Sequence, residues 1–323
     1  MCRINILLLG FLLCFLKVKA QEVKFLKEYH RFNIDTTVKV TVPFKGDFYC
    51  LKSNGQVFVI NSGTGLIDPS YQDNSKDVKL KDLLLKNDSL IGLSNTKNHY
   101  YLNKNEWIPL KETLGNSPIF EDDKYVVIST CSGEWGGSLY FRDKKTNKLY
   151  ECESTCTVSL VKKDSKYYVT ASLGHLSGFT DLFEIDDPSK LKVYNRDEIL
   201  KKKANAKKKK ITYVSYVGED ESRSEEGKTQ LADSIGVVAV SSFLYNSNFF
   251  YLVAKHGRTF ITSIQNKKLV TLDEIELKTD YYTSINRNYP DQTICNFRDD
   301  ETSGFIAIQN NKIVTYLFIY AHE

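Results

Sequence analysis

The sequence lacks the motifs by which most enzyme sites are recognised. It contains no G-x-S-x-G nucleophile elbow, no H-E-x-x-H zinc motif and no glycine-rich phosphate loop. Adjacent carboxylates such as Asp122 and Asp123 point to opposite faces of a strand or cap turns, so they do not form an acid/base pair. The sequence therefore assigns no reaction and no cofactor.

An excess of charge of one sign is also lacking. The chain has 44 basic and 40 acidic residues, which gives a formal net charge of +4. A nucleic-acid-binding face needs positive charge concentrated on one surface, so this balance argues against a nucleic-acid partner. The densest basic run lies in the Lys-rich segment 197–210, which we interpret as a solvated loop or short helix.

Long apolar runs are absent after the N-terminus, so no membrane span is expected. The run Ile4–Leu16 is shorter than the roughly 20 residues that cross a bilayer, and Val18-Lys19-Ala20 after it is a small-residue cleavage site. We predict a signal peptide at residues 1–20 and one mature domain at residues 21–323. The protein is then secreted, periplasmic or on the cell surface.

Methionine and proline are scarce, with one Met and six Pro, whereas Tyr (20) and Phe (18) are abundant. Val, Ile and Thr crowd short apolar runs, as half-buried pleated surfaces prefer. This composition favours an all-β protein.

A hairpin recurs along the chain: a β-run, a polar turn, and Leu or Ile near the start of another β-run. The Leu and Ile residues follow one another at 38 to 44 residues, and they are Leu66, Ile108, Leu149, Leu191, Leu231, Leu269 and Ile313. A period of about 40–45 residues with four short strands is typical of propeller blades. The spacing predicts a β-propeller of about seven four-stranded blades, with six blades as the other count and a pair of β-sandwiches as the alternative fold.

In period and hairpin the chain resembles seven-bladed propellers of the WD-repeat or YVTN-like kind. The elements Cys131-SGEWGG, Cys152-x3-Cys156 and His175-LSG look like those of uncharacterised secreted bacterial proteins. The resemblance implies a propeller fold and export, and it implies no activity.

The mature chain holds five cysteines, at positions 50, 131, 152, 156 and 295. Four residues of regular strand separate Cα atoms by about 13 Å, beyond the roughly 7 Å that a disulfide tolerates, so Cys152 and Cys156 can bond only across a turn. A bulge at the nearby glycines favours a bridge from Cys131 to Cys156. The alternatives are another pairing among these three, free thiols, or a zinc site of Cys131, Cys152, Cys156 and His175. A separate bridge from Cys50 to Cys295 would lock the ring.

If each recurring hairpin is the outer strand pair of a blade, the loop before it joins the second and third strands, and all such loops share one face. These loops carry the predicted ligand-binding residues Glu134, Trp135, His175, His256, Arg258, Arg298 and Asp299. Binding groups concentrate on loops held by a rigid scaffold. We therefore expect an exported binding protein for an unknown protein or glycan ligand. The alternatives are a Trp135 packed between blades, and an exported lyase or hydrolase acting on a carbohydrate or other polymer.

Overall fold

The computed structural model describes residues 23–320 apart from residues 74–77, 97, 111–117, 176, 198–199, 202–220, 278–286 and 300–301. The predicted signal peptide and most of the Lys-rich segment 197–210 lie outside the described residues. Within the described part of the chain, no helix is long and apolar enough to cross a bilayer.

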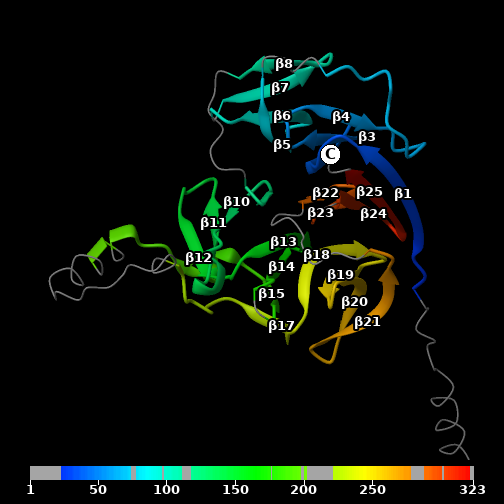
Figure 1. Cartoon of the computed structure of the whole chain (residues 1–323). Helices are drawn as coiled ribbons and strands as arrows, with labels where there is room; N and C mark the ends of the chain where they lie inside the picture. Colours follow the sequence, from blue (N-terminus) through cyan, green and yellow to red (C-terminus); the bar gives the residue numbers. More distant parts are fainter. Residues whose placement is uncertain are drawn as a thin grey trace, which may run out of the picture.

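Six sheets follow one another along the chain and stand around a common centre as the blades of a β-propeller (Figure 1). Blade 1 holds β2 (Val38–Phe44), β3 (Asp47–Lys52) and β4 (Val57–Ile60); blade 2 holds β5 (Leu80–Lys86), β6 (Ser89–Ser94), β7 (His99–Asn103) and β8 (Glu106–Pro109). Blade 3 holds β9 (Phe120–Glu121), β10 (Tyr125–Ser129), β11 (Ser138–Asp143), β12 (Leu149–Glu153) and β16 (Lys192–Val193); blade 4 holds β13 (Thr157–Lys163), β14 (Lys166–Leu173), β15 (Phe179–Ile185) and β17 (Thr229–Ile235). Blade 5 holds β18 (Val238–Tyr245), β19 (Asn248–Lys255), β20 (Arg258–Gln265) and β21 (Lys268–Ile275); blade 6 holds β22 (Arg287–Tyr289), β23 (Gln292–Arg298), β24 (Thr302–Gln309), β25 (Lys312–Tyr320) and β1 (Leu26–Ile34).

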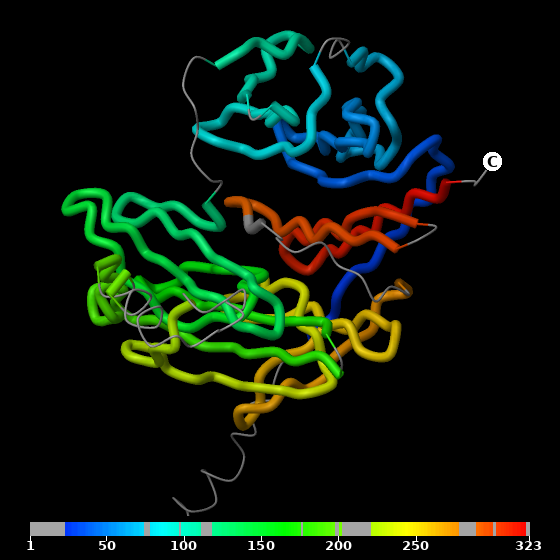
Figure 2. The backbone as a smooth tube through the Cα atoms, turned by 60° about the vertical axis from the view of Figure 1, so that its left-hand side comes forward, coloured from blue at the N-terminus to red at the C-terminus, as the bar shows by residue number. Residues whose placement is uncertain are grey.

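The N-terminal strand joins the last blade. Strand β1 pairs in parallel with β25, from Leu26 opposite Lys312 to Ile34 opposite Tyr320. Figure 2 shows the blue N-terminal strand beside the red C-terminal hairpin. The chain then passes directly into β2 of blade 1, so β1 ties the first blade to the last.

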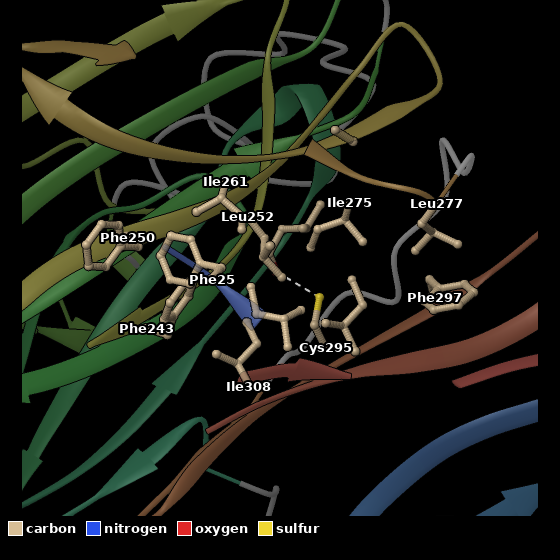
Figure 3. Close-up of a cluster of buried hydrophobic side chains, with 14 residues drawn as sticks. Phe25, Phe243, Phe250, Leu252, Ile261, Ile275, Leu277, Cys295, Phe297 and Ile308 are labelled. Atoms are coloured by element: carbon tan, nitrogen blue, oxygen red, sulfur yellow. Dashed lines mark hydrogen bonds between the residues drawn. The ribbon is translucent and has the colours of Figure 1, made fainter. Parts of the chain in front are cut away.

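Buried side chains lie between neighbouring blades, because the face of one sheet covers the face of the next. The described residues form five hydrophobic clusters, at the junctions of blades 1 and 2, 3 and 4, 4 and 5, 5 and 6, and 6 and 1. Figure 3 shows the cluster between blades 5 and 6, where Phe243 and Phe250 meet Phe25, and Cys295 lies toward blade 5. No such cluster joins blades 2 and 3 among the described residues.

The recurring hairpin is confirmed as the third and fourth strands of blades 2, 3, 5 and 6, and it is the outermost pair in blades 2 and 5. Its turns are tight because two successive residues take positive φ, as at Asn266 (51°) with Lys267 (61°) and at Lys104 (46°) with Asn105 (66°). Such two-residue turns match the right-handed twist of the strands that they join. Ile108, Leu149, Leu231, Leu269 and Ile313 all lie in fourth strands.

The propeller has six blades. The preferred count of seven is therefore wrong, the other count of six is right, and the β-sandwich alternative is wrong. The apparent unit from Leu191 to Leu231 is an insertion between β15 and β17 of blade 4. Just before Leu191, where the sequence predicts a hairpin turn, residues Pro188–Lys190 form a short 3-10 helix instead. Asp187 caps this helix by accepting a hydrogen bond from the backbone N–H of Ser189. The chain then adds β16 to the edge of blade 3, since Lys192 pairs with Glu151 of β12.

Candidate functional site

The second and third strands of each blade are joined by a B–C loop, and these loops share one face of the propeller because the strands alternate in direction. Backbone hydrogen bonds link these loops to the connections between blades, as from Gly236 N–H to the carbonyl oxygen of Gly178 (2.9 Å) and from Ser154 N–H to that of Gly137 (3.0 Å). We call this surface the B–C face.

The B–C loop of blade 3 is held by a disulfide. Cys131 in this loop is bonded to Cys156, which lies between blades 3 and 4 with a φ of 55°. The preferred pairing is therefore confirmed. Gly137 allows the close approach, because a Cβ on it would lie 2.6 Å from the carbonyl oxygen of Thr130 and 2.7 Å from that of Ser154.

The same loop is also held by residues 221–228, the last part of the insertion in blade 4. The Glu221 carboxylate accepts hydrogen bonds from the hydroxyls of Thr130, Ser132 (2.9 Å) and Ser138 (2.6 Å). The Ser138 hydroxyl accepts in turn from the N–H of Ser222 (2.6 Å), so its proton is directed to Glu221. This carboxylate is thus a common acceptor for three hydroxyls in the loop and at its ends.

Further contacts fix the 221–228 segment along blade 3. The Arg223 guanidinium donates to the carbonyl oxygen of Trp135 (2.8 Å), and the N–H of Glu153 donates to the carbonyl oxygen of Ser224 (2.9 Å). Lys228, whose side chain is only 3% exposed, donates to the carbonyl oxygen of Glu153 (2.9 Å) and lies over the Phe183 ring of blade 4 at 4.2 Å. Blades 3 and 4 are thus joined beneath the loop.

Two of the predicted binding residues meet on this support. Glu134 lies in the short 3-10 helix Gly133–Trp135 of blade 3, and its carboxylate is 3.1 Å from Nδ1 of His175 in the B–C loop of blade 4. Trp135 beside them is 44% exposed. Ile235, at the end of β17 opposite Phe179, is 81% exposed on the same face. We call Glu134, Trp135, His175 and Ile235 the loop patch.

The structure places the other four predicted residues on the B–C loops of blades 5 and 6 or at their bases. His256 is exposed in the turn after β19, and Arg258 forms an ion pair with Glu274 of β21 in its own blade. Arg298 is exposed at the end of β23. The Asp299 carboxylate accepts from the N–H (2.7 Å) and hydroxyl (2.8 Å) of Thr302, which shapes its loop.

The remaining cysteines are buried free thiols. Cys50, Cys152 and Cys295 have no disulfide partner in the structure, which excludes the possible bridge from Cys50 to Cys295. Burial raises the pKa of Cys50 and of Cys152 to about 12. The disulfide occupies the sulfur atoms of Cys131 and Cys156, two of the four ligands that the zinc alternative required, and the described residues contain no metal-binding group of His, Cys, Asp or Glu.

Sequence reasoning missed Glu221, Arg223 and Lys228. All three lie more than 80 residues after the loop in sequence. Glu221 and Arg223 contact the loop itself, whereas Lys228 contacts β12 and β15. The sequence showed them only as part of a polar stretch between two β-runs. Nothing in that stretch specifies which hydroxyls a glutamate meets.

No protein-family model and no curated protein matches the chain. Among solved structures it is similar to the computationally designed Ika8 protein, with 10% identity, 90% of this chain and 89% of that chain covered, and a TM-score of 0.42. BamB from Moraxella catarrhalis is 10% identical over 90% of this chain and 86% of its own, with a TM-score of 0.39. Puromycin hydrolase is 6% identical over 86% of this chain and 53% of its own, with a TM-score of 0.42. Likeness of this degree carries no argument about what the chain binds.

Proposed function

We propose that this chain is an exported binding protein that recognises a protein ligand through the loop patch on its B–C face. The observation that supports the proposal is an exposed indole beside a glutamate–histidine contact, on a loop held by a disulfide and by Glu221. Aromatic side chains in such settings supply much contact area at small entropic cost, and loops that are already ordered lose little freedom on binding.

The shape of the patch favours a protein over a small ligand. Trp135 and Ile235 present apolar surface to solvent, and the Glu134 carboxylate and His175 imidazole on the same face offer polar contacts. Protein interfaces have this composition, with an aromatic centre and a polar surround.

Site-specific photocrosslinking in producing cells tests this proposal. A crosslinker at position 135 should capture a defined partner. The same group at position 272 is the control and should capture none, because Leu272 lies on the outer strand of blade 5, outside the loop patch. The two positions are equally exposed (43% for Leu272 and 44% for Trp135). With the purified partner, Trp135→Ala should weaken binding by about 30-fold, the effect of losing roughly 2 kcal/mol at a central aromatic contact.

His175→Ala should also weaken binding, and neither substitution should change the melting temperature by more than a few degrees. Equal capture from positions 135 and 272, or a collapse of thermal stability in both variants, would mean that these residues serve the fold alone.

A further inference from the structure

Three hollows lie on the face opposite the B–C face, among the tight turns that join first to second and third to fourth strands. Two of them, of about 590 Å³ and 490 Å³, share the β22–β23 turn from Tyr289 to Gln292 as a wall. The larger is formed by blades 1, 2 and 6, and the smaller by blades 3 to 6, so together they surround the centre of the propeller. We call the larger one the axial cavity.

The wall of the axial cavity is a fixed aromatic turn. Tyr289 is half-buried, and it packs against both the cluster between blades 6 and 1 and the cluster between blades 1 and 2. Pro290 follows it, and a proline ring fixes the backbone φ of the turn. Tyr289 is therefore held in place before any ligand arrives, which lowers the entropic cost of binding.

Around this tyrosine the cavity offers hydrogen-bonding groups of both kinds. Gln292 and Gln309 carry carboxamides, which donate and accept, and Asp88 and Asp291 carry carboxylates, which accept. Lys45 at the opposite rim lies over the ring of Phe44 at 5.0 Å. Lys312 is paired with Glu28 (2.9 Å).

This lining selects the chemistry of a ligand. The two carboxylates repel a polyanion. A lipid chain would leave the carboxamides and charged groups without hydrogen-bonding partners, and burying such groups unpaired costs free energy. A neutral ligand rich in hydroxyls satisfies carboxamides and carboxylates, and its flatter apolar faces can pack on an aromatic ring. A volume of about 590 Å³ lies within the roughly 300–1,000 Å³ of ligand sites.

We propose that the axial cavity binds a neutral oligosaccharide, with Tyr289 as the aromatic platform and Gln292 and Gln309 as hydrogen-bonding groups. This site is separate from the loop patch, since it lies on the other face and shares no residue with it. A protein that binds a partner on one face and a glycan on the other links the two.

Calorimetry of the mature protein with soluble hexaoses tests the proposal. The probes are cellohexaose, maltohexaose, xylohexaose, mannohexaose and chitohexaose, each up to millimolar concentration. At least one should bind, and Gln309→Ala should weaken that binding about tenfold, as expected for one lost hydrogen bond and its unsatisfied partner. Tyr289→Leu, which keeps an apolar side chain in the turn, should weaken it at least as much.

Gln265→Ala is the matched control. Gln265 ends the third strand of blade 5 as Gln309 ends that of blade 6, and it lines the third hollow instead of the axial cavity. This variant and Trp135→Ala should bind the hexaose as the wild type does. The proposal is overturned if no hexaose binds, if Gln309→Ala binds normally, or if Gln265→Ala loses as much. Because Gln309 is exposed, its variant gives a decisive result even where Tyr289→Leu is unstable.

Discussion

Replacing Glu221 by glutamine should loosen the B–C loop of blade 3 and destabilise the protein. The carboxylate accepts hydrogen bonds from three hydroxyls, those of Thr130, Ser132 and Ser138. A glutamine of the same shape has one accepting oxygen, and its NH₂ can bond the remaining hydroxyl only if that hydroxyl turns to accept. One bond is therefore reversed, and all three lose the charged acceptor.

The size of this effect follows from the change in acceptor. Hydrogen bonds to charged groups contribute about 1.5–3 kcal/mol each and neutral ones about 1 kcal/mol. Reversing one charged bond and weakening two, with some relaxation of the loop, should lower the free energy of unfolding by about 2–4 kcal/mol. Chemical denaturation of the mature protein measures this directly.

A second readout reports the loop itself. Trp107 is 7% exposed and Trp135 is 44% exposed, so in a Trp107→Phe background the fluorescence comes from the loop patch. Glu221→Gln should shift this emission to the red and raise its quenching by acrylamide, because Arg223 holds the Trp135 carbonyl from the adjoining segment. Glu226→Gln is the control, since Glu226 is exposed in the same segment. A Glu221→Gln variant within about 0.5 kcal/mol of Glu226→Gln would refute the reasoning.

Three further outcomes are expected. Burial acts to raise the pKa of Asp122, but hydrogen bonds from Lys162 and Tyr167 lower it to about 2. The ionised Asp122 therefore stabilises the folded protein by about 2 kcal/mol, fully above about pH 4 and progressively less toward pH 2. Asp122→Asn should remove that part of the acid sensitivity in pH-dependent melting. Gly304→Ala should cost about 3 kcal/mol or more in denaturation, because a Cβ there would lie 2.1 Å from a backbone oxygen, whereas Gly174→Ala, with nothing within 4 Å, should cost under about 1 kcal/mol. Without reductant, thiol titration of the unfolded mature chain should find three reactive thiols, those of Cys50, Cys152 and Cys295. Five reactive thiols would contradict the disulfide.

The outer hairpins could be predicted because their information is local. Polar turn residues followed by Leu or Ile define them, and in blade 3 such a turn sets the register that puts Arg142 opposite Leu149 and Ser138 opposite Glu153. The blade count could not be predicted in the same way. The insertion in blade 4 is as long as a blade, and only the cap at Asp187 and the pairing of β16 with blade 3 reveal that it is not one.

For the candidate site, the sequence predicted a common face but no contacts on it. Loops that follow corresponding strands share a face by topology, whereas the approach of Glu134 to His175 depends on how blades 3 and 4 pack. The disulfide was predicted with the right partners for a different reason. We expected a bulge within one ladder, but Cys131 lies in a loop that turns back before β11 begins.

The parallel pairing of β1 with β25 gives the folding of this protein an order in time. Leu26 lies opposite Lys312, 286 residues later (312 − 26), so β1 leaves the ribosome long before its partner β25 is made. At the usual 5–20 residues per second that delay is roughly 15–60 s. During it the first strand is a ready partner for any unpaired edge, including that of another copy. The closing of the last blade therefore requires that β1 and β25 be present in the same compartment at once.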